Sequence, residues 1–342
     1  MPSSSKLVNT SEAFELRLVH YLGNHDATSP FVLECESLMN DGNVSALLNT
    51  IFNDSSALNV LFDQSRTKNN NNFSFTSNND GNSNEEDGVH AFTLLCALLD
   101  SIDDNQERND VMNTMVKKIE DYNVDVTVKE TDKSGDETEK STLGIVVDKK
   151  LKMLCALYNL RHDGAEKCWI LSRILHTCAF GGDDETVLSL LPGRDSALGT
   201  LLEKNNLGTL LVQLEKQGPQ TFSNSEKRVL YATAIDVSAK VEDVCKEKGM
   251  TKDATIANGS KQRFRLKFLS TYSSIDNVDE PALAAAADAA VGAICDPIAL
   301  FNEQRCIMSL PPVMALKNDT GESMSSFQII LVIVMQVNVS FL

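Results

Sequence analysis

The chain has 342 residues, enough for two ordinary domains or one long helical array. With 42% hydrophobic and 23% charged residues it has a globular composition, and the 6% aromatic content leaves a core of Leu, Ala, Val and Ile, as is common in helical packing. The net charge of -17 argues against a dominant phosphate-binding role, because affinity for nucleic acid depends mainly on cations.

The cysteines and the start of the chain indicate an intracellular protein. The eight cysteines form no C-x-x-C pair, and Ser3 to Lys6 lead straight into an amphipathic stretch instead of a signal peptide. Disulfides are rare in a reducing compartment, so we predict a cytoplasmic location and free thiols that are mostly small core side chains. The cysteines are Cys35, Cys96, Cys155, Cys168, Cys178, Cys245, Cys295 and Cys306.

The first part of the chain divides into a helical segment and a polar insertion. Residues 1–65 contain helix-like apolar runs such as EAFELRLVHYLG. Asn, Ser, Asp and Glu dominate residues 66–88, a composition that cannot bury enough apolar surface to order itself. We predict that 66–88 is a disordered insertion acting as a spacer, and that residues 128–140 form an exposed loop.

Residues 89–317 are predicted to form a helical-repeat region, in which helical periodicity resumes after the insertion and becomes regular after residue 140. Two sets of apolar residues have the spacing of one helix face. The first set is Val147, Leu151, Leu154 and Tyr158, and the second is Leu171, Leu175 and Cys178.

The clearest helix begins near Ser223. Ser223 and Glu226 have the spacing of a capping box, and Gly249 marks the end of the helix. Its apolar stripe consists of Leu230, Ala234, Val237, Val241 and Val244.

Two more helices are expected to follow. Phe264, Phe268 and Tyr272 share one face, and Asp279 is placed to cap the Ala-rich segment after it. Pro281 is tolerated there because it falls in the first turn.

These patterns predict an all-α fold. No convincing strand occurs between residues 143 and 316, and each expected helix has one apolar face that it cannot bury alone. We therefore predict an α-solenoid of stacked helix pairs. The residues expected to be buried include Leu151, Leu154, Leu230, Val237, Phe268 and Ile294.

The densest group of potential metal ligands lies between residues 155 and 178. The nearest pair, His176 and Cys178, lies about 200° apart on a helix at roughly 100° per residue, so the two cannot face one metal from one helix. We predict no metal and no cofactor. The chain has no G-x-S-x-G, phosphate-binding glycine loop or H-E-x-x-H motif, so no catalytic residue is assigned. The potential metal ligands between residues 155 and 178 are Cys155, His162, Cys168, His176 and Cys178.

Four basic residues alternate with apolar ones in KQRFRLKF. Basic residues interleaved with aromatics can form a nucleic-acid surface, although on a helix the phenylalanines would point inward and the cations would form a solvated flank. We treat the four cations as a weak candidate contact for RNA or a partner, and direct RNA contact stays open. They are Lys261, Arg263, Arg265 and Lys267.

The stretch AICDPIALFNEQRCIMSLPPV at 293–313 contains two proline breaks. Pro297 disfavours a helical conformation at Asp296, so the Ala-rich helix should stop there. Another helix should begin at the Pro311-Pro312 pair. Cys295 and Cys306 have no histidine nearby, and we expect them neither to pair nor to bind metal.

The order of these segments resembles the PCI-domain family and, within it, the subunit M family of eukaryotic translation initiation factor 3. The likeness covers roughly residues 90–317. It rests on three segments. The first is LKMLCALYNL (151–160), and the second is the capped helix with Ser225-Glu226-Lys227-Arg228. The third is the Ala-rich helix Ala282 to Ile294, which is followed by Asp296-Pro297, Leu300-Phe301 and Leu310 to Val313.

This resemblance implies PCI-type helical repeats and a scaffold role without catalytic residues. It also implies partners: the other subunits of translation initiation factor 3, and indirectly the small ribosomal subunit during mRNA recruitment. Within the same fold, a subunit of the COP9 signalosome or of the proteasome lid is the alternative, and a standalone α-solenoid adaptor is another. Fold alone does not choose among them.

The chain departs from the family after Leu316. The family continues into a winged-helix subdomain that makes the main contacts between subunits, and here that subdomain is absent or replaced by a divergent apolar tail at 318–342. Residues 327–342 are shorter than the roughly 20 residues of a membrane span, so we expect no membrane partner. A translated intron, a strand-prone tail and a tail anchor remain open for this segment, and the missing subdomain puts assembly into the complex in question.

Overall fold

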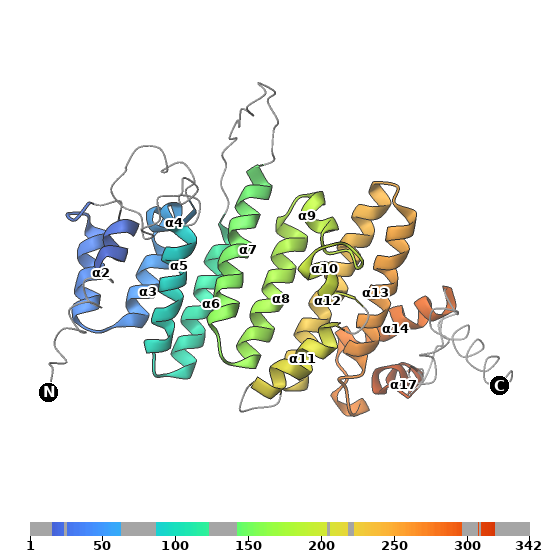
Figure 1. Cartoon of the computed structure of the whole chain (residues 1–342). Coiled ribbons are helices and arrows are strands. Elements are labelled where there is room, and N and C mark those ends of the chain that lie inside the picture. The colour runs from blue at the N-terminus through green and yellow to red at the C-terminus, as the bar shows by residue number, and fades with distance from the viewer. Residues whose placement is uncertain are drawn as a thin grey trace, which may run out of the picture. The chain divides into compact units, whose positions relative to one another are not determined.

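The structure is a computed structural model, and it describes residues 16–23, 26–62, 87–122, 142–203, 206–217, 222–295, 307 and 309–318. Every regular element in these ranges is helical and none is a strand (Figure 1), which confirms the all-α prediction for this part of the chain. No helix among these residues combines the length and apolarity needed to cross a membrane. The predictions for 66–86, 128–140, 296–306 and 319–342 lie outside the described residues.

The chain forms two compact units, Met1–Arg161 and His162–Leu342. The boundary falls inside residues 89–317, which the sequence analysis treated as one region. Each unit has its own set of buried apolar side chains.

The first unit has a core of Leu, Ile and Phe side chains between short helices. Phe52 meets Phe92 edge to face with 6.1 Å between ring centroids, and α3 packs against α6 while α5 packs against α7. Asp87 and Gly88, which the sequence analysis placed in the insertion, belong to α5. Residues 16–22 are helical as well. The named helices are α2 (Pro30–Asn40), α3 (Val44–Asn53), α4 (Ser55–Phe62), α5 (Asp87–Leu98), η2 (Leu99–Ser101), α6 (Asn105–Asp121) and α7 (Thr142–Leu160).

Helix α7 buries a different face from the predicted one. Val147 and Leu154 are buried as predicted, but Leu151 and Tyr158 are only half-buried. The prediction that Leu151 lies in the core is therefore wrong. The buried residues on α7 and just after it are Val147, Lys149, Lys150, Met153, Leu154, Leu157 and Arg161.

The reason for this rotation is that cations occupy the inner face. Lys150 Nζ donates to the Glu120 backbone oxygen over 2.7 Å. Arg161 donates through Nη2 to the Cys96 backbone oxygen over 3.0 Å and pairs with Asp100 over 3.1 Å. Long cationic side chains can bury their stems when their charged ends reach acceptors, and a search for apolar residues alone does not find such a face.

The second unit is built around the long helix α12. Helix α12 packs against α8 and α13, and α14 packs against α13 and α17. The helices are α8 (Gly164–Gly181), α9 (Asp184–Leu188), α10 (Ala197–Leu201), α11 (Asn206–Gln217), α12 (Asn224–Glu247), α13 (Thr251–Leu269), η3 (Ile275–Asn277), α14 (Glu280–Cys295) and α17 (Pro311–Asn318).

The predicted start, stripe and end of α12 are confirmed. The Ser223 hydroxyl accepts from the Glu226 backbone N–H over 3.2 Å, and the Glu226 carboxylate accepts from the Ser223 N–H over 2.6 Å. Gly249 follows the helix with φ of 69°, in the left-handed region that favours glycine. All five stripe residues are buried, and so are Leu171, Leu175 and Cys178 on α8.

Helices α14 and α17 of this unit also begin where expected. Asp279 accepts from the Ala282 N–H over 3.0 Å and so caps α14, while α17 begins at Pro311. Helix α14 ends at Cys295, the residue before Asp296. Phe264, Phe268 and Tyr272 are buried. The predicted burial of Ile294 concerns a side chain outside the described set.

Candidate functional site

Helix α13 carries the four cations that the sequence analysis singled out. Phe264 and Phe268 point into the core, as the helical interpretation required. Lys261, Arg263, Arg265 and Lys267 are all half-buried instead of fully exposed. The cations therefore flank a packed face, and their charges depend on the neighbouring helices.

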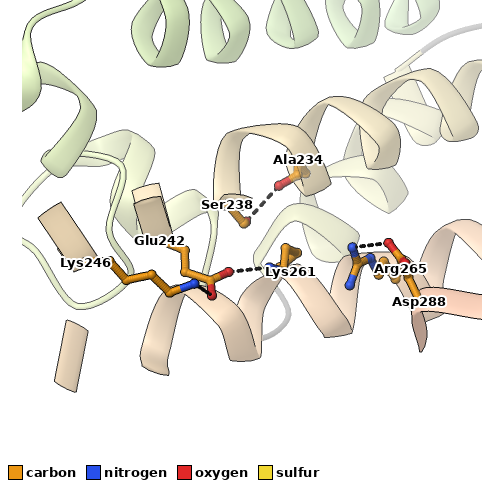
Figure 2. A network of polar contacts seen from close by, with 7 residues as sticks. All are labelled: Ala234, Ser238, Glu242, Lys246, Lys261, Arg265 and Asp288. Carbon is orange, nitrogen blue, oxygen red and sulfur yellow. Dashed lines mark hydrogen bonds and ion pairs between the residues drawn. The ribbon is translucent and has the colours of Figure 1, made fainter. Parts of the chain in front are cut away.

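Lys261 forms an ion pair with Glu242 of α12. Figure 2 shows the Glu242 carboxylate between two ammonium groups, that of Lys261 and that of Lys246, whose Nζ lies 2.6 Å away. The side chain of Glu242 is 9% exposed and that of Lys261 is 16% exposed. Burial tends to raise the pKa of Glu242, but the hydrogen bonds from Lys246 and Lys261 outweigh burial and hold that pKa below its ordinary value. This carboxylate stays ionised and joins α12 to α13.

Arg265 lies one helical turn after Lys261 on α13 and pairs with α14 instead of α12. Its guanidinium donates to the Asp288 carboxylate of α14 over 2.6 Å (Figure 2), and Asp288 is 58% exposed. Arg263 donates to the Ser260 hydroxyl over 2.7 Å, within its own helix. The cation row thus joins three helices of the second unit.

This pairing limits what the row offers to a phosphate. Lys261 and Arg265 each have a carboxylate as nearest charge, which reduces the positive potential available to nucleic acid. Removing either charge would also disturb contacts between helices. The assignment of Lys261, Arg263, Arg265 and Lys267 as an RNA or partner contact stays a prediction.

A second polar cluster joins the ends of α12, α13 and α14. The Arg228 guanidinium lies over the Tyr272 ring, 3.7 Å from its centroid, and Arg228 Nε donates to the Thr271 hydroxyl over 3.0 Å. The Tyr272 hydroxyl donates to Asp279 over 2.7 Å. Burial raises the pKa of Tyr272 to about 12, with the Asp279 contact adding to the effect, so the phenol stays neutral. Tyr272 was predicted from the sequence to share a helix face and Asp279 to cap a helix, but the contact of Arg228 with Tyr272, which is distant in the sequence, has no local sequence signal.

The buried thiols are not activated for nucleophilic chemistry. Burial raises the pKa of Cys35 and Cys168 to about 12 and that of Cys178 to about 11, and nearby carboxylates add to the effect at Cys35. Burial also raises the pKa of Cys155. These cysteines remain thiols at neutral pH, and the thiolate is the reactive form.

The group between residues 155 and 178 shows no metal-binding geometry. Cys168 and Cys178 are buried in α8, whereas Cys155, His162 and His176 are exposed. In the ranges that the structure describes, no three or more His, Cys, Asp or Glu side chains come together as metal ligands would. Cys306 and the side chain of Cys295 lie outside those ranges.

Comparisons with known proteins identify no relative. No protein-family model matches the chain. No curated protein and no solved structure matches it either.

Proposed function

We propose that the chain is a non-catalytic scaffold built as an α-solenoid of stacked helix pairs. The observation that carries this proposal is the packing around α12, which contacts α8 on one side and α13 on the other, while α13 in turn contacts α14. Each helix buries an apolar face against its neighbours, as helices in a stacked array must do. Such arrays act mainly by presenting an extended surface to other macromolecules.

The assembly that we propose is eukaryotic translation initiation factor 3. The support is the resemblance of 151–160, 225–228 and 293–313 to the subunit M family. In this role the chain would bind other subunits of the factor in the cytoplasm and support recruitment of the small ribosomal subunit and mRNA. The proposal assigns no catalytic residue and no cofactor.

Affinity purification of the tagged full chain, followed by mass spectrometry, tests this assignment. We expect co-purification of several initiation factor 3 subunits in comparable amounts. Recovery of signalosome or proteasome-lid subunits instead would overturn the assignment and keep the scaffold class. Recovery of the chain without any stable partner set would favour a standalone adaptor.

Two neighbouring residues on α12 supply control variants for the affinity purification, because unfolded chain can bind other proteins non-specifically. Leu230 is fully buried, whereas Val229 is 51% exposed. Leu230→Asp should unfold the second unit and abolish specific recovery, because it buries a charge. Val229→Asp should keep the fold. Partners that also bind the Leu230→Asp chain are not specific.

A further inference from the structure

We draw no further inference here: the strongest candidate, the outward stripe of α8 with half-buried Trp169 and Arg173 and exposed His176 and Phe180, is a helix face for which nothing in the structure shows what covers it.

Discussion

Among single residues, Leu154 and Leu151 on α7 test most directly which face of that helix enters the core. The Leu154 side chain is 0% exposed and Leu151 is half-buried. Leu154→Ala should lower the free energy of unfolding by about 2–5 kcal/mol, through lost burial and the cavity left behind. Leu151→Ala should cost about 1 kcal/mol, because less of its surface leaves water on folding. Urea unfolding of both variants measures the difference. If Leu151→Ala lowered the free energy of unfolding more than Leu154→Ala, Leu151 would lie in the core, as predicted from the sequence.

Glu242 should give the second unit a measurable dependence on acid. Because the pKa of Glu242 is lower in the folded than in the unfolded chain, its contribution to stability is present above the ordinary glutamate value of about 4.3. The contribution is lost as the pH falls through the lower folded-state pKa. Glu242→Gln should therefore be less stable than the wild type at pH 7. The stability difference should shrink as the pH falls from 5 towards 3.

Thermal unfolding of both proteins over this pH range measures the effect. Asp288→Asn is the matched control, since Asp288 also accepts from a cation of α13 but is mostly exposed. A carboxylate that is mostly in solvent contributes only about 0–1 kcal/mol to a pair even when its partner Arg265 is 15% exposed, so this variant should follow the wild-type curve much more closely than Glu242→Gln. A stability difference between Glu242→Gln and wild type that does not change with pH would contradict the role assigned to the carboxylate.

These polar contacts explain why the sequence could not place every buried side chain. Lys150 reaches an oxygen 30 residues earlier in the chain, and Arg161 reaches one 65 residues earlier. A periodicity argument treats Lys and Arg as exposed unless a partner is known, and the partner becomes visible only after folding. The same reason hid the Glu242–Lys261 pair, whose members are 19 residues apart.

At the level of elements, the capping box of α12 should contribute measurably to stability. Ser223→Ala removes the acceptor for the Glu226 N–H and should cost about 1 kcal/mol, within a range of roughly 0.5–2. Ser223→Asp keeps a side-chain acceptor at this position and should recover most of the loss. Chemical unfolding followed by circular dichroism measures both variants. Equal stability of the Ala and Asp variants would show that the cap contributes nothing to the second unit.

The sequence predicted elements well where their signals are local. Both Ser223 with Glu226 and Asp279 with Ala282 act over three residues, so the pattern could be read directly. The five-residue helices α9 and α10 were not predicted, because so short a run shows no periodicity. Asp183 and Ser196 cap these helices through their side chains, but five residues are too few for the apolar ones to show a helical period.

For the whole molecule, fold class could be predicted and function could only be proposed. One apolar face on each helix is sufficient to predict an all-α protein, since such helices must pack together. The scaffold role stays a proposal, because binding to a partner surface would leave no catalytic motif in the sequence by which to recognise it. The four cations of α13 show the difficulty. The sequence shows that four basic residues lie close together, but it does not show that Lys261 pairs with α12 and Arg265 with α14.

The division at residue 161 predicts that the chain can be cut there without destroying either core. Fragment 1–161 keeps the Arg161 contacts to Cys96 and Asp100. Fragment 162–342 keeps Asp163, which caps α8 by accepting from the Ala165 N–H over 2.6 Å. We expect both fragments to be helical by circular dichroism and to unfold cooperatively, because each retains its own buried apolar residues.

A cut between Gly181 and Gly182 is the matched control for this prediction. It removes α8 from fragment 182–342, and with it the helix that packs against α12. The apolar face of α12 would then be partly exposed, so this fragment should aggregate or lose its cooperative transition. Differential scanning calorimetry and size-exclusion chromatography distinguish the cases. If 162–342 behaves no better than 182–342, or if 1–161 shows no transition, the two units do not fold independently, and the whole chain folds as one.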